Sequence, residues 1–432
     1  MGKEFRLTRL SKDVILRNFR PRDWLATART IWGILHDKPR IADKETHAGL
    51  QKNSNPPDPA GSLTVSGWNR ADCPPETSRA PRPSLMERQD SPQPCVLYQS
   101  DNGAVVCLDI PRSIEEAQSP PGEVTCRRLF STSPLLVPFE TPESRHGDGD
   151  QSTALTPSAQ LALLMTSAAV QDALQHIYEH FPGPYCLPRV TRPSSNPNPS
   201  PESYFTPHGS HALEGSIQET RDELVSTAPQ FDLILVDPPW PNRSAKRKKG
   251  GYSTCRSHGA TRDLLSLIPA PARLAPGGVL AVWVTNSHSA TELLTAKDGL
   301  FAQWGLEQAA EWIWLKVTAH GEPMVDVEST WRKPWERLLI AKRKGDEVRP
   351  LVDRKVIVAV PDVHSRKPNL RPLFDDVLDS GYQALEVFAR HLTAGWWSWG
   401  NEATMFQAES NWTRYAKPQD VDLGCAVEPL DQ

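Results

Sequence analysis

The four residues Asp237-Pro238-Pro239-Trp240 bring together a carboxylate, conformationally fixed carbonyls and a large aromatic ring. They follow the apolar run 231–236 directly, which places them at the end of a buried strand. The Asp237 carboxylate and the Pro238 carbonyl can accept both N–H hydrogens of an exocyclic amine such as that of adenine, and so turn its lone pair toward an electrophile. Proline fixes φ, so this carbonyl is already in position. Trp240 could stack on the base, which contributes about 1–3 kcal/mol. The alternative, a turn with a buried tryptophan, is disfavoured by the order of all four residues after a strand.

A short basic run lies just beyond this motif. Because the formal net charge of the chain is -4 and its pI is about 6.3, a nucleic-acid substrate must be met by a local patch of this kind. The candidate substrate-binding residues are Asn242, Lys246, Arg247, Lys248, Lys249 and Tyr252. The four cations would contact phosphates, which positions a polynucleotide without reading its sequence. A nuclear import signal and a solvated loop are the alternatives.

Strands alternating with helices are predicted to position this chemistry. Apolar runs predict strands over 231–236, 279–285, 311–317, 335–341, 355–360 and 384–388, and helices over 264–274, 293–304 and 373–380. This order is typical of an α/β fold with helices on both faces of a sheet. Ligands of such sheets bind beyond the carboxyl ends of the strands, so Asp237, Asn286 and Arg390 are expected to converge.

The composition divides the chain of 432 residues into five parts. The composition of residues 1–93 predicts a mostly disordered leader. The whole chain has 41 prolines and a mean hydropathy of -0.48, which indicates that part of it does not pack into a core. Residues 94–187 predict a small α+β accessory domain, with a hairpin around Asn102-Gly103 and a helix over 161–180. Residues 188–207 read as a linker, 208–407 as the main α/β domain and 408–432 as a C-terminal tail.

The cysteines and the apolar runs exclude several classes of protein. The seven cysteines are far apart and form no Cys-x-x-Cys pair, so no zinc site is predicted. No apolar run reaches the roughly 20 residues of a membrane span, and no secretory signal is visible. These features predict a soluble intracellular protein without a membrane partner.

From Asp237-Pro238-Pro239-Trp240 outward, the chain resembles the DPPW-signature adenine-N6 methyltransferases, the family of the eukaryotic messenger-RNA N6-adenosine methyltransferase. Within this family, the chain is most similar to the methyltransferase-like protein 4 branch. Three segments carry this resemblance: the basic loop after the motif, residues 96–99 together with 108–114, and residues 182–189. The resemblance spans roughly residues 94 to 407. It implies a Rossmann-like methyltransferase domain with a permuted, mostly parallel sheet, in which the catalytic strand comes early and the cofactor strand late.

The same resemblance implies an S-adenosylmethionine site. The family's cofactor-binding positions correspond to five residues of this chain. Asp237 would face the methionine ammonium and Lys367 would pair with the methionine carboxylate. Arg390, Asn401 and Glu402 would hold the ribose and adenine end. No Gly-x-Gly-x-x-Gly follows the cofactor strand, which disfavours a nicotinamide dehydrogenase. Trp331 and Glu336 are candidate contacts of the target base. The family has an acidic residue on a short segment before the catalytic strand that reaches the cofactor adenine, and here the segment 211–216 offers Glu214 for that position.

These residues lead to one expected function and two rivals. The expected reaction is methyl transfer from S-adenosylmethionine to the N6 amine of adenosine in RNA, and the branch implies a small nuclear RNA such as U2 with a 2′-O-methylated adenosine. The rivals are methylation of DNA adenine and a catalytically silent RNA-binding scaffold, which an intact motif disfavours. No metal is needed, because a sulfonium is already an activated methyl donor. We expect a protein of the nucleus, with the cytoplasm as an additional location, that is active as a monomer; the need for a partner subunit stays open.

Overall fold

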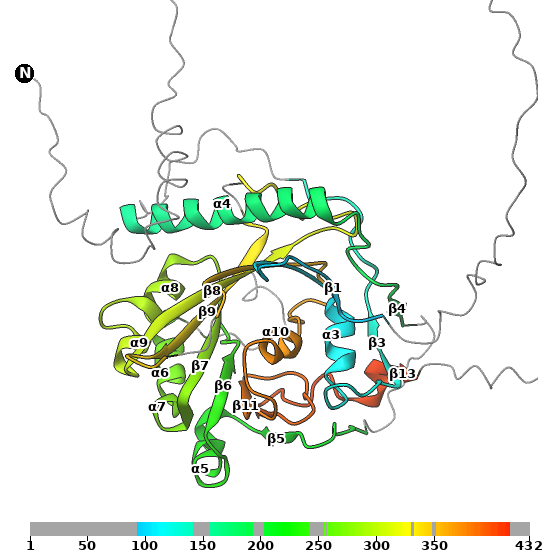
Figure 1. The fold of residues 1–432 in the computed structure, drawn as a ribbon. Helices are drawn as coiled ribbons and strands as arrows, with labels where there is room; N and C mark the ends of the chain where they lie inside the picture. The colour runs from blue at the N-terminus through cyan, green and yellow to red at the C-terminus, as the bar shows by residue number, and fades with distance from the viewer. Residues whose placement is uncertain are drawn as a thin grey trace, which may run out of the picture. The chain divides into compact units, whose positions relative to one another are not determined.

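A computed structural model describes residues 93–140, 156–192, 203–241, 255, 257–329, 332–347 and 351–414 (Figure 1). The chain divides into two compact units, Met1–Arg82 and Pro83–Gln432, and every described residue belongs to the second. The predicted leader, apart from residue 93, and the end of the predicted tail from residue 415 onward lie outside the described residues.

The centre of the second unit is a ten-stranded sheet in the order β1-β2-β10-β8-β9-β7-β6-β11-β12-β5. Its strands are β1 (Val96–Gln99), β2 (Val105–Leu108), β5 (His211–Glu214), β6 (Phe231–Val236), β7 (Leu274–Val284), β8 (Leu306–Lys316), β9 (Trp335–Arg343), β10 (Arg354–Ala359), β11 (Ala384–Val387) and β12 (Trp397–Gly400). Pairing is antiparallel between β1 and β2 and on both sides of β9, and parallel elsewhere. The prediction of a mostly parallel α/β sheet is confirmed.

The catalytic strand β6 shows why the sheet forms. Ile234 and Val236 face one hydrophobic cluster and Leu233 and Leu235 face another, because successive side chains of a strand point to opposite faces. Both faces are therefore covered, which is why this strand has an apolar run rather than an alternating pattern.

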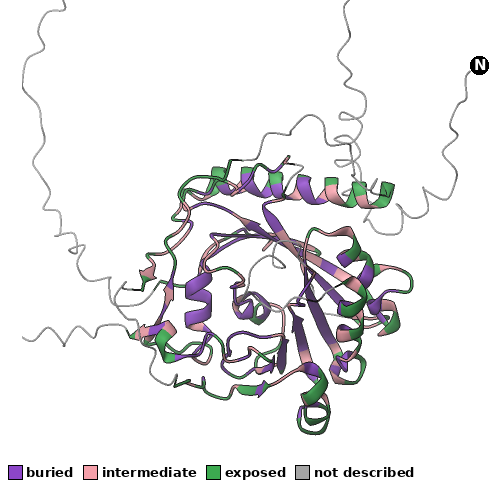
Figure 2. Ribbon diagram, turned by 180° about the vertical axis from the view of Figure 1, so that it is seen from behind, coloured by how far each residue is buried: buried purple, intermediate pink, exposed green. Residues whose placement is uncertain are grey.

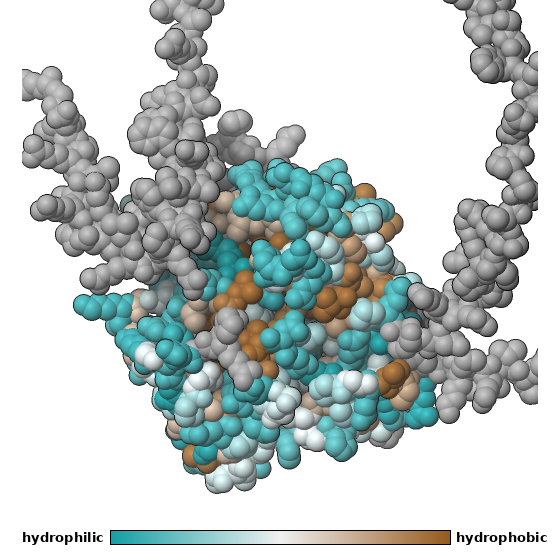
Figure 3. All heavy atoms as spheres, viewed as in Figure 1, coloured by the Kyte–Doolittle hydropathy of each residue, from teal (hydrophilic) through white to brown (hydrophobic). Residues whose placement is uncertain are grey.

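Helices cover the two faces of the sheet. The first cluster receives α5 (Ile217–Thr227), α6 (His258–Ser266), α7 (Ala270–Arg273), α8 (His288–Thr295) and α9 (Leu300–Gln303). The second receives α3 (Ile110–Glu116) and α10 (Arg371–Asp375), and a third cluster lies under α4 (Pro157–His180). Figure 2 shows the sheet and α3 as buried, and α4 as buried along one side. Apolar patches gather in the middle of the face of the molecule that Figure 3 shows.

The segment 94–187 is not a separate domain, in contrast to the prediction. The hairpin around Asn102-Gly103 is confirmed as β1 and β2, and the predicted helix is α4. However, β2 pairs in parallel with β10, so the hairpin extends the main sheet. This pairing satisfies the edge of β10, which would otherwise expose unpaired backbone groups.

The predicted linker and tail also contain ordered strands. β3 (Arg127–Ser131) lies between β4 (Val190–Thr191) and β13 (Trp412–Arg414) in a three-stranded sheet. A short 3-10 helix, η2 (Glu409–Asn411), precedes β13. The linker boundary at 207 and the tail boundary at 408 were wrong for these residues, because two- and three-residue strands have no readable periodicity and depend on partners distant in sequence.

Two predicted helices are each divided in two. The pattern over 264–274 corresponds to the end of α6, then α7, and the pattern over 293–304 to the end of α8, then α9. The second break falls at Gly299, where an added Cβ would lie 2.6 Å from the Leu294 carbonyl oxygen, so only glycine fits the tight turn. Within the described ranges, no helix combines the length and the hydropathy needed to cross a membrane, and no cluster of potential metal ligands occurs.

Candidate active site

The carboxyl ends of β6 and β11 bring the predicted catalytic and cofactor residues to one edge of the sheet. The backbone amide of Asp237 donates to the Val387 carbonyl at 3.3 Å, which ties the start of the motif to the end of β11. Asn286, which follows β7, donates its side-chain amide to the Trp335 carbonyl at the start of β9 (2.6 Å). These contacts place Asp237 against the end of β11 and Asn286 against the start of β9, and the convergence of Asp237, Asn286 and Arg390 stays a prediction.

The motif loop is held by its own backbone and by its tryptophan. The Trp240 amide donates to the Pro238 carbonyl at 2.8 Å, and the Cys255 amide donates to the Pro239 carbonyl at 2.9 Å. The Trp240 indole N–H donates to the Trp283 carbonyl at 2.7 Å, and only 6% of Trp240 is exposed. The expectation that Trp240 stacks on a base does not fit this burial. Its ring packs in the core beside β7 and fixes the loop, which is a positioning role.

Asp237 is the first member of a row of alternating charges. Lys367 Nζ lies 2.8 Å from Asp237 Oδ1 and 3.4 Å from Glu336 Oε2, and Lys316 pairs with the other oxygen of Glu336. These four side chains come from the ends of β6 and β8, the start of β9 and the loop after β10. The sequence identified the first three residues but missed Lys316, whose position is evident only once β8 and β9 are paired.

The row is strongly coupled electrostatically. Burial raises the pKa of Glu336, but Lys367 and Lys316 outweigh burial and bring the pKa down to about 2. Burial lowers the pKa of Lys367, but Asp237 and Glu336 outweigh it and raise the pKa above its ordinary value. Both groups are therefore charged at neutral pH, and the edge presents ionised groups of both signs.

Glu386 is a buried acid beside this row that the sequence did not single out. Burial, and next the negative charge of Asp237, raise its pKa to about 8, although Arg390 and Lys367 act in the opposite direction. The same burial, with Arg366 and Arg390, lowers the pKa of His391 to about 4. His391 Nε2 lies 3.8 Å from Glu386 Oε2. At neutral pH both groups are therefore neutral. A glutamate in the middle of an apolar strand was the signal that could have revealed this site.

The predicted ribose-binding residues lie where β11 and β12 end. Arg390 Nε lies 3.2 Å from Glu402 Oε2, and Arg390 Nη1 donates to the Ser365 carbonyl at 3.0 Å. Asn401 follows β12 directly and is exposed. Phe388 has a φ of +60°, a left-handed conformation unusual for a bulky residue, and its amide donates to the Trp399 carbonyl at 2.7 Å. This turn aims Arg390 toward Glu402.

Glu214 lies beside these residues, on the neighbouring strand. It ends β5, and its backbone pairs in register with Gly400 of β12. Both Glu214 carboxylate oxygens lie 3.2 Å from the Thr404 hydroxyl. The sheet thus brings an acidic residue from before the catalytic strand to the segment 401–404.

The remaining predicted substrate contacts lie outside the described residues. They are Asn242, Lys246, Arg247, Lys248, Lys249, Tyr252 and Trp331. Glu336, the other candidate contact of the target base, is instead engaged by two lysines in this structure.

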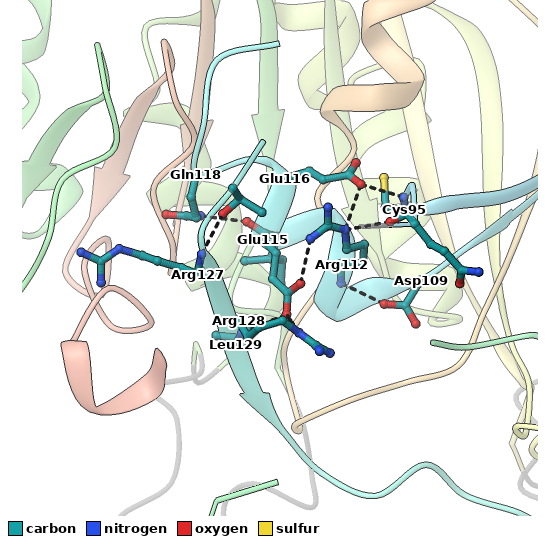
Figure 4. Close-up of polar contacts among 12 residues, drawn as sticks. Cys95, Asp109, Arg112, Glu115, Glu116, Gln118, Arg127, Arg128 and Leu129 are labelled. Carbon is teal, nitrogen blue, oxygen red and sulfur yellow. Dashed lines mark hydrogen bonds and ion pairs between the residues drawn. The ribbon is translucent and has the colours of Figure 1, made fainter. Parts of the chain in front are cut away.

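A second ionic cluster lies around α3 (Figure 4). Arg112 contacts Glu115 at 3.2 Å and Glu116 at 3.1 Å, and Arg128 contacts Glu115 at 3.4 Å. Backbone amides complete the cluster: Leu129 donates to Glu115 and Cys95 to Glu116, each at 2.9 Å. The cluster fastens the residue before β1 and the middle of β3 to α3.

Comparisons with known proteins identify the family of the chain. The sequence profile of the MT-A70 family matches residues 231–402, the span from β6 to Glu402. The chain is 52% identical over 325 residues to the N6-methyladenosine RNA methyltransferase MTA1 of Cryphonectria parasitica, covering 73% of this chain and 94% of that protein. It is 36% identical to the human N(6)-adenine-specific methyltransferase METTL4, covering 48% of this chain and 44% of that protein. It is 35% identical to a DNA N6-methyl methyltransferase of Caenorhabditis elegans, covering 43% of this chain and 48% of that protein.

Proposed function

The chain belongs to the MT-A70 family of adenine-N6 methyltransferases, and from this premise we propose that it transfers a methyl group from S-adenosylmethionine to the N6 amine of adenosine in RNA. The observation that carries the proposal is the contact of Asp237 with Lys367, 2.8 Å apart at the end of the catalytic strand. A carboxylate and an ammonium group this close together can pair with the ammonium and the carboxylate of an amino acid, such as the methionine part of the cofactor.

The residues at this edge fit the cofactor by the chemistry of their donors and acceptors. Lys367 would pair with the methionine carboxylate and Asp237 with the methionine ammonium. Glu402, with 38% of its side chain exposed, can accept hydrogen bonds from both ribose hydroxyls, and Asn401 and Arg390 lie beside it. The cofactor supplies a sulfonium-bound methyl group, which is electrophilic without a metal.

The motif loop would bind and orient the adenine amine. The Asp237 carboxylate and the Pro238 carbonyl each accept one N–H hydrogen, which draws the nitrogen out of conjugation with the ring. The Pro238 carbonyl already accepts from the Trp240 amide, and its second lone pair serves the substrate. Because the loop is fixed before the substrate binds, little reorganisation is needed at the moment of reaction.

The protonation state of Glu386 supports the same assignment. With its pKa raised to about 8, Glu386 is uncharged at neutral pH and adds no second negative charge beside Asp237. Asp237 therefore stays available to a cationic or N–H-bearing partner. After methyl transfer the amine must lose a proton, and Asp237 is the carboxylate already hydrogen-bonded to it.

RNA is the favoured substrate because the relative with 52% identity is named as an RNA enzyme. DNA adenine is a second candidate, since another relative is named for DNA. Within RNA, we propose a 2′-O-methylated adenosine in a small nuclear RNA and a nuclear location, both of which rest on the branch resemblance. The basic loop 246–249 is proposed to contact the phosphates of this substrate.

One experiment separates these alternatives. The purified protein is incubated with isotope-labelled S-adenosylmethionine and either total small RNA or genomic DNA, and the nucleosides are analysed by mass spectrometry. We expect label in N6-methyladenosine, or in N6,2′-O-dimethyladenosine, from RNA. Label in deoxyadenosine alone would establish DNA as the substrate, and no label in either sample, from protein that binds the cofactor, would contradict the proposed activity.

A further inference from the structure

The small sheet β13-β3-β4 concentrates arginine from three distant parts of the sequence. Arg127 and Arg128 lie on β3, Arg192 directly follows β4, and Arg414 ends β13. We call these four residues and their strands the arginine sheet. In Figure 1 its strands lie together beside α3.

The positive charges of Arg127 and Arg414 do not stabilise the fold, because the two residues face each other across a strand pair. They are directly opposite one another in the antiparallel pairing of β3 with β13, an arrangement in which like charges repel. Within the described ranges, neither guanidinium forms an ion pair. In Figure 4 the Arg127 side chain extends away from Glu115. An unneutralised pair of this kind is suited to a polyanion from outside the sheet.

The other two arginines, Arg192 and Arg128, place further positive charge on the same small sheet. Arg192 is exposed and donates to neutral acceptors, the Ser410 carbonyl at 2.8 Å and the Asn411 side-chain oxygen at 3.1 Å. Arg128 contacts Glu115, which it shares with Arg112, and donates to the Pro188 carbonyl at 2.7 Å.

Aromatic rings accompany these charges. The Arg127 guanidinium stacks on Phe205, 3.8 Å from the ring centroid, and Phe205 packs edge-on against Trp412. Tyr204 is 53% exposed and is held against the start of η2 by a backbone bridge to Ala408. Guanidinium groups that contact phosphates, together with an exposed ring that can stack on a base, are the combination that binds single-stranded nucleic acid.

The arginine sheet is fastened to the carboxyl edge that carries the candidate active site. Arg366, the neighbour of Lys367 in the chain, donates to the Phe130 carbonyl of β3 at 3.1 Å. Asn411, at the end of η2, donates to the Met405 carbonyl at 3.2 Å, close in sequence to Glu402. The surface is therefore joined by direct hydrogen bonds to the two segments proposed to hold the cofactor.

We propose that the arginine sheet binds the sugar-phosphate backbone of a single-stranded stretch of the substrate that flanks the target adenosine. This inference rests on the proposed function for its substrate class, but its own test is a binding measurement. The partner is a polynucleotide rather than an acidic protein, because the exposed Tyr204 beside the arginines offers a stacking surface for a base.

The test uses the full chain and two ligands without adenine, an oligouridylate and an oligothymidylate of about 24 nucleotides, long enough to span more than one typical single-strand site. The variant Arg127→Gln/Arg414→Gln should bind both roughly tenfold more weakly at moderate salt, and the log–log salt slope should flatten by about 0.7 for each phosphate that is no longer neutralised. Arg127→Lys/Arg414→Lys keeps the charge and should keep the salt slope. A control of equal charge change, Lys297→Gln/Lys344→Gln, removes two exposed cations from other elements and should bind like wild type.

Methyl transfer to a short adenosine-containing oligonucleotide of about six nucleotides, too short to reach far from the active site, separates this inference from the proposed function. Saturating transfer should be unchanged in the glutamine variant. An unchanged salt slope, or an equal effect of the Lys297/Lys344 control, would overturn the inference while leaving the enzyme assignment intact. If an acidic protein binds this surface and the oligonucleotides do not, the assignment of a polynucleotide as the partner is likewise wrong. Should the double variant fail to fold, Arg414→Gln alone serves, with an expected slope change of about 0.7.

Discussion

The α3 cluster and the charged row at the carboxyl edge are both built from carboxylates and cations, yet their carboxylates have different partners. In the α3 cluster, Glu115 and Glu116 each accept a backbone amide in addition to arginine. At the carboxyl edge, the hydrogen-bond partners that the structure shows for the Asp237 and Glu336 carboxylates are lysine ammonium groups. Backbone amides are fixed by the fold, whereas lysine side chains can turn to a new partner.

The pKa values express the same difference. Burial raises the pKa of Glu115 in spite of its amide and arginine partners, so the α3 cluster is dominated by its exclusion from water. For Glu336, the two lysines outweigh burial and lower the pKa to about 2. The α3 cluster thus holds three segments of the chain together. In the row at the carboxyl edge, Asp237 and Lys367 can instead exchange each other for the charged groups of a zwitterionic ligand.

The largest effect is expected for Asp237→Ala. Loss of one preorganised acceptor should lower the rate of methyl transfer by about 10²–10³ or more. The fold should be retained, because Lys367 keeps Glu336 as a partner. The measurements are labelled-methyl transfer and thermal unfolding, with Asp222→Ala, an exposed aspartate on α5, as the control. Activity close to wild type in a folded variant would remove Asp237 from the mechanism.

The converse effect is expected for Glu115→Ala in the α3 cluster. The change removes the acceptor of the buried Leu129 amide and one ion-pair partner of Arg112, which should lower the free energy of unfolding by about 3 kcal/mol. Transfer per folded molecule should stay unchanged. Chemical denaturation and assays below the unfolding transition test both points, and Glu123→Ala, an exposed change of equal charge, is the control. If Glu115→Ala lost activity without losing stability, the α3 cluster would have a role in catalysis and not only in stability.

A smaller effect is expected when Asn401→Ala and Glu402→Ala are combined. Charged hydrogen bonds contribute about 1.5–3 kcal/mol, so affinity for S-adenosylmethionine should fall roughly tenfold to a hundredfold, with little change in RNA affinity. Calorimetric titration with the cofactor and a separate RNA-binding assay provide the two numbers. Glu292→Ala, an exposed glutamate on α8, is the control. If RNA binding drops and cofactor binding does not, these residues serve the other ligand.

The smallest effect concerns the pH dependence of stability. The pKa of Glu386 is about 8 in the folded protein, above the ordinary value near 4.5, so the folded state holds a proton that the unfolded state has lost. Stability should therefore fall as pH rises toward 8, by up to about 1.4 kcal/mol per pH unit, and level off above it. Glu386→Gln should remove this contribution to the slope between about pH 6.5 and 9, whereas the contribution of His391, which titrates near 6.5 in the unfolded state, is common to both proteins. Denaturation at several pH values measures it, with the exposed Glu307→Gln as control; an unaltered slope in Glu386→Gln would mean that Glu386 is ionised in the folded protein.

Local patterns in the sequence were sufficient for the elements that carry the catalytic motif. The apolar run over 231–236 predicted β6, and Asn102-Gly103 between two apolar runs predicted the β1-β2 hairpin. Asp237, Lys367 and Glu336 were identified by residue type and family resemblance, and the structure places them in contact. Glu386, Lys316 and the buried state of Trp240 were missed, because each depends on which strand lies next to which.

What the sequence by itself determined is chemistry and periodicity: a motif with a carboxylate and rigid carbonyls, and strands whose side-chain pattern repeats over a few residues. Only the tertiary structure decided that the segment 94–187 extends the main sheet, since the parallel pairing of β2 with β10 joins residues about 250 positions apart. It likewise decided that Arg127 and Arg414 lie opposite one another. Pairing across such distances is fixed by burial and by satisfaction of backbone hydrogen bonds over the whole fold, and no local window of the sequence contains that information.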